Sequence, residues 1–245
     1  MPDSANSPLN DTEKSQLLAN YQAVLDELAK CNEAAGRAQN GAALLAVSKT
    51  KPAAMLRALW QAGQVDFGEN YLQEALAKQA LLADLPIVWH YIGSIQRNKT
   101  KDIAAHFDWV HTLERGLIAK RLSEQRGEIC RQNPSVPPLN VLIQLNIDDE
   151  ASKSGVLPDE LFALVDEVAQ LPNLCLRGLM IIPDKAGSDA FVRTQALFDE
   201  VRARFDLPQW DTLSMGMSGD MAQAVAHGST MVRIGTAIFG ARDYA

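Results

Sequence analysis

One lysine stands where covalent chemistry with a carbonyl compound could take place. Lys49 follows an apolar run, Ala43 to Ser48, and the two-residue period of a strand places it on the same face as Leu45 and Val47. Burial of that face would favour the neutral amine, which is the form that makes a Schiff base with an aldehyde. A lysine that reaches outward from a strand end into water is the common alternative.

A second lysine lies two residues further along the chain. Lys51 directly precedes Pro52, which places it in the turn before the next helix. We therefore expect Lys49, rather than Lys51, to carry any covalent chemistry.

Two segments near the C-terminal end could hold a phosphate group. Ser218 and Thr236 supply hydroxyl groups there, and the neighbouring glycines let backbone N–H groups approach an anion closely. These glycines are Gly216, Gly219 and Gly235. Ser218 could instead cap a helix and bind no ligand. If a phosphate does bind, the carboxylate of Asp220 must point away from it.

Arg233 lies between Val232 and Ile234 in a run that should be buried. A guanidinium in such a place needs a partner. An ion pair with a neighbouring carboxylate would be a purely structural arrangement. Donation to an acceptor on a ligand is the functional alternative.

The four histidines show no pattern typical of a metal site. His90 and His111 fall in predicted strands, whereas His106 and His227 fall in predicted helices, and no pair has a third ligand at a suitable spacing. We expect histidines of the core or rim, and no metal. A serine hydrolase is not indicated either, because the sequence lacks a G-x-S-x-G motif.

The strands and helices that must position these side chains alternate in a regular pattern along the chain. After an expected frayed tail, residues 1–11, an amphipathic helix is predicted from about Thr12 to Ala35, and residues 12–245 are expected to form a single domain. Eight short apolar runs then alternate with helical patterns. The runs are Ala43 to Ser48, Val65 to Gly68, Ile87 to Ile92, Trp109 to Leu113, Asn140 to Ile147, Leu174 to Ile182, Thr212 to Met215 and Met231 to Gly235.

Alternating strands and helices predict a parallel sheet with right-handed crossovers. Eight units in 245 residues fit a closed (β/α)8 barrel, in which polar residues at the strand ends form the active site. An open doubly wound sheet is the alternative. The sequence has neither the G-x-G-x-x-G turn nor the phosphate loop that are typical of many open sheets.

Composition and charge exclude several classes of protein. The formal net charge of −7 disfavours a nucleic acid partner, and no window approaches the 18 apolar residues of a membrane span. Cys31, Cys130 and Cys175 are too far apart for a disulfide framework or a zinc motif, which favours a reducing compartment. The N-terminus has no pattern of a signal peptide, and we expect a cytoplasmic protein.

Several motifs together resemble those of the pyridoxal-phosphate homeostasis proteins, also called the YggS-like or proline synthase co-transcribed family. The resemblance covers nearly the whole chain. The motifs are Ala46 to Pro52, Phe67 to Tyr71, Trp89 to Gly93, Gln96 to Lys99, Ser152 to Gly155, Arg177 to Met180, Met215 to Ser218, and Met231 to Thr236 with Phe239 and Gly240.

This resemblance implies the fold and the roles of the site residues. It implies the (β/α)8 barrel of the alanine racemase N-terminal type, with an extra N-terminal helix and without the C-terminal β-domain of the racemases. It also implies that Lys49 forms the internal aldimine with pyridoxal 5′-phosphate (PLP) and that Asn70 lies near the cofactor. Arg233 would face the pyridine nitrogen. The phosphate would be held by Ser218, Gly235 and Thr236.

The function implied is storage or delivery of PLP in vitamin B6 homeostasis, without significant catalytic turnover. Apo forms of PLP-dependent enzymes are the expected recipients, and a monomer is the expected state. The alternative is an enzyme acting on amino acids, such as a racemase. Racemases of this fold take a second base, a tyrosine, from the C-terminal β-domain of a partner subunit, and we expect this chain to lack that domain. An aldolase that uses Lys49 directly on a sugar phosphate is a third, weaker possibility.

Overall fold

Alternation of short apolar strands with helices closes the chain into a barrel of eight parallel strands. The computed structural model describes residues 8–37, 41–184 and 189–241. Each strand pairs with the next along the chain, and β8 pairs with β1 to close the barrel. The strands are β1 (Ala43–Val47), β2 (Asp66–Glu69), β3 (Val88–Tyr91), β4 (Trp109–Leu113), β5 (Leu139–Leu145), β6 (Leu174–Ile181), β7 (Thr212–Ser214) and β8 (Met231–Ile234).

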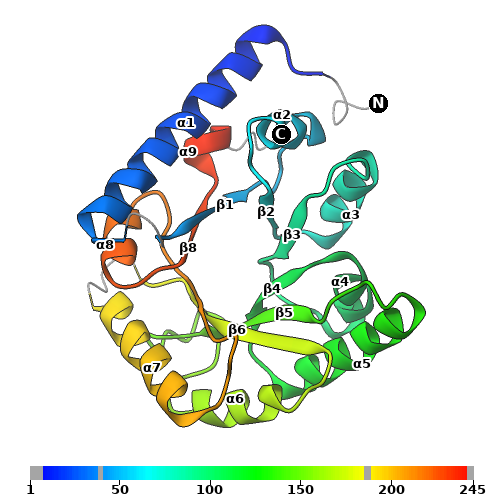
Figure 1. Ribbon diagram of the computed structural model, residues 1–245, viewed down its shortest axis with the longest axis vertical. Helices are drawn as coiled ribbons and strands as arrows, with labels where there is room; N and C mark the ends of the chain where they lie inside the picture. Colours follow the sequence, from blue (N-terminus) through cyan, green and yellow to red (C-terminus); the bar gives the residue numbers. More distant parts are fainter. Residues whose placement is uncertain (1–7, 38–40, 185–188, 242–245) are drawn as a thin grey trace.

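Helices form a layer around the outside of this barrel (Figure 1). They are α1 (Asp11–Ala34), α2 (Ala53–Gln61), α3 (Leu72–Leu81), α4 (Thr100–His106), α5 (Gly116–Gln132), α6 (Leu161–Ala169), α7 (Ala190–Arg204), α8 (Met221–Ala226) and α9 (Thr236–Phe239), with a 3₁₀ turn at Arg97–Lys99. The closed barrel confirms the predicted fold class, and the open-sheet alternative is wrong. The described residues contain no second domain.

Strand alternation sorts side chains between two packed layers. In β1, Leu44 and Ala46 belong to the main hydrophobic cluster, whereas Leu45 is fully buried on the other face. Leu45 lies beside Gly68 of β2, where a Cβ would be 3.4 Å from the leucine side chain. Val47 continues the Leu45 face and lines a cavity at the mouth of the barrel. The predicted orientation of this strand is therefore confirmed.

Gly178 allows β6 and β7 to approach each other. Its φ is +149°, and a Cβ there would lie 1.9 Å from the carbonyl oxygen of Thr212. The register between β5 and β6 shifts at this point, because Val141 pairs with Leu176 while Leu142 pairs with Gly178. Glycine is needed here because any side chain would collide with the neighbouring backbone.

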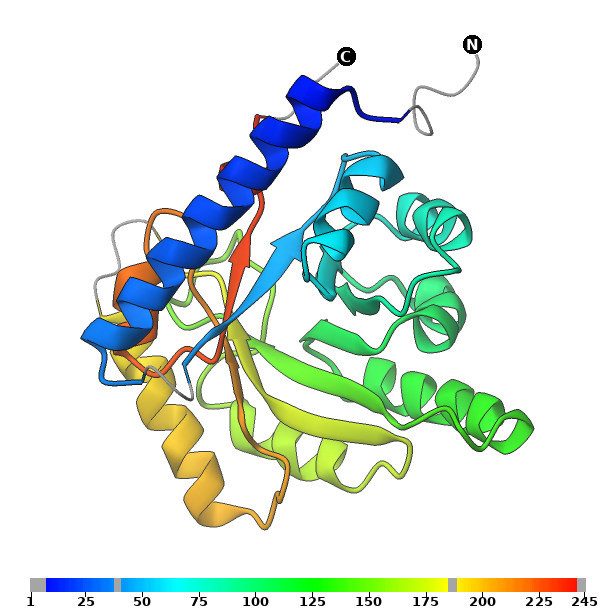
Figure 2. The ribbon, with the colours of Figure 1, turned by 45° about the horizontal axis from the view of Figure 1, so that its top comes forward.

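The first helix covers the barrel beside α8 and α9 (Figure 2). Its buried face repeats every three or four residues. It consists of Leu17, Tyr21, Val24, Leu28 and Cys31. Asn10 and Glu13 form a reciprocal capping box, so the helix begins at Asp11, one residue before the predicted start. Residues 1–7 of the predicted tail lie outside the described residues.

Most predicted strand boundaries differ from the structure by one or two residues. Helix α6 begins at Leu161 with Glu160 at its N-cap, so Pro158 lies in the turn before the helix.

None of the described helices combines the length and the apolar character needed to cross a bilayer. Cys31, Cys130 and Cys175 are all free thiols.

Candidate functional site

One cavity at the carboxyl ends of the strands brings together all six residues predicted to bind a cofactor. It is lined by Val47, Lys49, Lys51, Asn70, Ile92, Met180, Ile182, Met217, Ser218, Arg233, Gly235, Thr236, Phe239 and Gly240. The six predicted residues come from four segments far apart in sequence. The closed barrel brings these segments together because parallel strands all end at the same rim.

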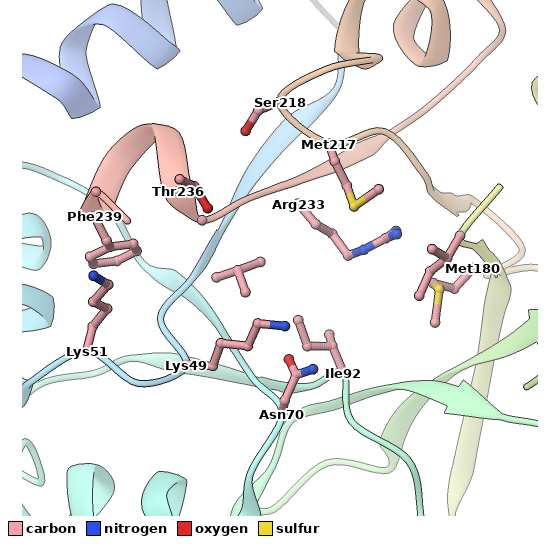
Figure 3. Close-up of a pocket in the computed structure, with 14 residues that line it drawn as sticks. Lys49, Lys51, Asn70, Ile92, Met180, Met217, Ser218, Arg233, Thr236 and Phe239 are labelled. Atoms are coloured by element: carbon pink, nitrogen blue, oxygen red, sulfur yellow. The ribbon is translucent and has the colours of Figure 1, made fainter. Parts of the chain in front are cut away.

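Lys49 and Arg233 extend into this cavity from different strands (Figure 3). Lys49 lies in the turn after β1, and its half-buried side chain points toward Asn70 and Ile92. Arg233 lies within β8 and is buried. Ser218, on the loop that follows β7, and Thr236, the first residue of α9, lie on another side of the cavity.

Lys51 also lines the cavity, but its amine is engaged elsewhere. Its Nζ donates a hydrogen bond of 2.7 Å to the carbonyl oxygen of Ala241. In Figure 3 it lies beside Phe239, away from Arg233. The Lys49 side chain instead points toward Asn70 and Ile92, and this position favours Lys49 over Lys51 for covalent chemistry.

The turn that carries Lys49 is strained and tightly held. Thr50 has φ +63°, which is unusual for a β-branched residue. Its backbone N–H donates to Glu74 Oε1 of α3 over 2.5 Å, and the Ser48 carbonyl accepts from Lys78 Nζ over 2.7 Å. A strained conformation persists only where its surroundings enforce it, and these bonds fix the backbone on both sides of Lys49.

A buried ion pair lies directly behind this turn. Lys78 Nζ is 2.7 Å from Glu69 Oε1 at the end of β2 and 2.6 Å from Glu74 Oε1. The Ser48 hydroxyl donates to the same Glu69 oxygen over 2.6 Å. Burial raises the pKa of the Glu69 carboxyl, and the charge of Lys78 opposes that rise. Glu69 lies within the motif Phe67 to Tyr71, and no pattern in the sequence predicts its pairing with Lys78.

Lys78→Met is expected to lower the free energy of unfolding by about 3–5 kcal/mol, the cost of leaving one member of a buried pair without its partner. Urea unfolding followed by circular dichroism measures it. Lys120→Met is the matched control, because Lys120 Nζ pairs with Glu167 over 2.8 Å at an exposed position. That variant should lose little or no stability, because an ion pair exposed to water contributes little. Equal losses in the two variants would contradict a structural role of the buried pair.

Only some of the residues predicted to hold a phosphate line the cavity. Ser218, Gly235 and Thr236 line the cavity, whereas Gly216 and Gly219 are not among its lining residues. Gly216 instead has φ +97° and lies against α8, where a Cβ would be 2.6 Å from that of Ala224.

Ser218 does not cap a helix, so that alternative is wrong. Helix α8 begins three residues later at Met221, with Asp220 at its N-cap position. The Asp220 carboxylate accepts a hydrogen bond of 2.5 Å from the backbone N–H of Met217. This bond turns the carboxylate back onto its own loop, as phosphate binding would require.

Arg233 has backbone and hydroxyl partners instead of a carboxylate within salt-bridge distance among the described residues. Its Nη1 donates to the carbonyl oxygen and to Oγ of Ser214 over 2.6 and 3.0 Å, and its Nη2 donates to the Ile181 carbonyl over 2.8 Å. Burial lowers its pKa to about 10, against the opposing effect of Asp220. The guanidinium is therefore still charged at neutral pH.

The Asn70 side chain offers an unused acceptor at the cavity. Its Oδ1 is buried and has no hydrogen-bond partner among the described residues. A buried polar atom without a partner costs free energy, and a ligand could supply the missing donor. The residues present therefore fit a cofactor that has both an aldehyde and polar ring substituents.

Within the described ranges, no group of three or more His, Cys, Asp or Glu residues is placed to hold a metal ion. His90 and His111 are fully buried in the barrel, as core histidines would be. Lys49, Lys51 and Arg233 are the ionisable side chains among the described residues that line the cavity.

Comparisons with known proteins agree with this geometry. Residues 20–243 match the family model of the alanine racemase N-terminal domain. The pyridoxal phosphate homeostasis protein of Pseudomonas aeruginosa is 53% identical over 235 residues, which cover 94% of this chain and 97% of that protein.

Solved structures give the same result. PipY of Synechococcus elongatus PCC7942, solved with PLP bound, is 35% identical with a TM-score of 0.73, over 92% of this chain and all of that one. Alanine racemase of Clostridium difficile 630 has a TM-score of 0.70 at 11% identity, over 94% of this chain and 57% of that one, and this likeness shows the fold alone. The chain therefore belongs to the pyridoxal phosphate homeostasis protein family, whose barrel corresponds to the N-terminal domain of alanine racemases.

Proposed function

We propose that this protein binds PLP in the Lys49–Arg233 cavity, holds it covalently through Lys49, and stores the cofactor or passes it on. One observation carries the proposal: Lys49, Arg233 and the Asn70 oxygen, which has no partner in the part of the chain that the structure describes, meet in a single cavity. The solved complex of the related PipY with PLP supports it. When bound, PLP supplies an aldehyde that an amine can hold covalently and a ring that can withdraw electrons from an attached amino acid.

The lining residues divide the cavity by chemistry. Ser218 and Thr236 would donate hydroxyl hydrogen bonds to the phosphate, beside Gly235, whose lack of a side chain leaves the backbone accessible. Val47 and Ile92 offer apolar contact to the ring. Asn70 would accept a hydrogen bond, while the amine of Lys49 would secure the aldehyde.

Arg233 would limit the chemistry of the bound cofactor. A guanidinium can only donate hydrogen bonds, so a ring nitrogen beside it stays an unprotonated acceptor. An unprotonated ring withdraws electrons less strongly, which disfavours transaminase-type reactions. This side chain therefore favours holding PLP over using it in catalysis.

Among the described residues, no tyrosine or carboxylate lines the cavity as a second acid–base group for racemisation, and the amine of Lys51 donates to the Ala241 carbonyl. Tyr91 is buried, and its hydroxyl donates to the Ser94 carbonyl over 3.1 Å. Tyr71 is exposed, and neither tyrosine lines the cavity. A racemase needs proton transfer on both faces of the substrate, and Lys49 can serve only one of them.

We expect no significant racemisation, transamination or decarboxylation of free amino acids. A proton-transfer step that lacks its positioned acid or base loses roughly 10²- to 10⁴-fold in rate. Incubation of the PLP-loaded protein with a panel of amino acids, followed by chiral chromatography, measures this. Turnover near the enzyme median of ~10 s⁻¹ on any amino acid would favour the racemase alternative.

Delivery is tested with the loaded protein itself. PLP-loaded protein is mixed with the apo form of a PLP-dependent enzyme, and recovery of that enzyme's activity is followed with and without a scavenger of free PLP. Recovery that persists with the scavenger supports direct transfer. Recovery of the enzyme's activity only without the scavenger would indicate that the protein stores PLP and releases it into solution. The expected monomeric state and cytoplasmic location remain predictions.

A further inference from the structure

A chain of hydrogen bonds crosses the interior of the barrel from Asp66 on β2 to Arg233 on β8. Asp66 Oδ1, at the start of β2, is 2.9 Å from His90 Nε2. His90 Nδ1 is 2.9 Å from His111 Nε2 on the next strand. His111 Nδ1 is 3.0 Å from Ser214 Oγ, which accepts from Arg233 Nη1.

The two ends of this chain fix the direction of every bond in it. Arg233 can only donate, and the ionised carboxylate of Asp66 can only accept. A neutral His90 must therefore carry its proton on Nε2 and accept on Nδ1. His111 must then donate from Nε2 and accept on Nδ1 from the Ser214 hydroxyl.

Burial keeps the His111 imidazole neutral. Both rings are fully buried, and burial, with the nearby positive charge of Arg233, holds the pKa of His111 well below its usual 6.5. A cationic His90 would donate toward His111 and leave the Ser214 hydroxyl proton without an acceptor in the hydrogen-bond chain.

Aromatic and cationic groups also pack around His90. Trp109 stacks on His90 with ring centroids 5.4 Å apart, and the Arg177 guanidinium, paired with Asp211, lies over the Trp109 ring.

Among the described residues, Nη1 and Nη2 of Arg233 already have acceptors, two on Ser214 for Nη1 and the Ile181 carbonyl for Nη2, whereas Nε has none. The Nε–H and the second Nη2–H are left for a ligand. The plane of the guanidinium therefore depends on Ser214, and Ser214 depends on the histidines behind it.

We infer that Asp66, His90, His111 and Ser214 are positioning residues that orient Arg233 toward the ring of the cofactor. All hydrogen bonds of this series run in one direction, because each residue donates to the next, from Arg233 to Asp66. This inference rests on the proposed function for its purpose, but its geometry belongs to the protein alone. No member below Arg233 lines the cavity, so none of the four is expected to touch PLP.

The first test uses the protein without PLP. Nitrogen-15 NMR of labelled histidines is expected to show His90 and His111 as neutral rings protonated on Nε2, each as a single tautomer near pH 7.5. Asp66→Ala should remove the final acceptor and give His90 a mixture of tautomers. A mixture in the wild-type protein, or no change of His90 in Asp66→Ala, would overturn the inference.

The second test measures the effect on PLP. Ser214→Ala disconnects Arg233 from His111 and is expected to weaken PLP binding about tenfold, the scale of one hydrogen bond to a charged group, and to shift the absorption maximum of bound PLP. Ser229→Ala is the matched control, because Ser229 is equally buried but its hydroxyl bonds to the Met215 carbonyl over 2.7 Å, outside the chain. It should change stability without moving the spectrum.

The outcomes separate this inference from the proposed function. Identical spectra and affinities in Ser214→Ala and Ser229→Ala overturn the positioning role, while trapped PLP on wild-type Lys49 would still support the proposed function. Absence of PLP from wild-type Lys49 after borohydride reduction overturns the proposed function instead, and the tautomers of the cofactor-free protein remain readable.

Discussion

Lys49→Ala is expected to abolish covalent attachment of PLP completely while leaving weaker noncovalent binding. The Lys49 side chain supplies the amine, whereas Ser218, Arg233 and Thr236 line other parts of the same cavity and are unchanged by the substitution. Incubation with PLP, borohydride reduction and peptide mapping by mass spectrometry measure attachment, and equilibrium dialysis measures the residual binding.

Lys51→Ala is the control for this result. Its amine lines the same cavity but donates to the Ala241 carbonyl, so the variant should keep covalent PLP on Lys49. A pyridoxyl group on Lys51 of the wild-type protein, or on neither lysine, would show that the assignment of Lys49 is mistaken.

Arg233→Glu is expected to destabilise the protein by at least about 3 kcal/mol, the scale for an uncompensated buried charge. The carboxylate would face the carbonyl oxygens of Ser214 and Ile181, which now accept hydrogen bonds from the guanidinium. Oxygen acceptors repel one another, and burial denies them water. Thermal and urea unfolding measure the loss.

The same variant tests the electronic role of Arg233. A carboxylate beside the ring nitrogen would favour its protonated form, so any PLP still bound should show an altered absorption spectrum. Arg131→Glu, at an exposed position on α5, is the control and should change stability by no more than about 0.5 kcal/mol. A large loss of stability in Arg233→Glu with an unaltered spectrum would make Arg233 structural only.

The fold could be predicted from local patterns. The eight apolar runs alternate with helical periodicity, and each run is too short to be a buried helix, so the parallel barrel follows from the order of elements. Helix ends were less predictable. The start of α1 depends on which neighbouring side chain satisfies the first free N–H groups, as Asn10 does in the capping box.

The composition of the site could also be predicted, because barrel geometry brings strand ends together. Lys49 and Arg233 lie 184 positions apart in sequence and line one cavity. The relation of Lys51 to Ala241 could not be foreseen, since it depends on where the end of the chain passes the barrel mouth.

The sequence by itself determined the barrel, the strand faces and the residues that gather at its mouth, because these depend on periodicity and order along the chain. Only the tertiary structure decided which buried polar groups pair. Glu69 meets Lys78 behind the Lys49 turn, and His111 links His90 to Ser214. Such pairings depend on strand register and side-chain direction to within about 3 Å, the length of a hydrogen bond, and residue spacing along one chain does not contain that information.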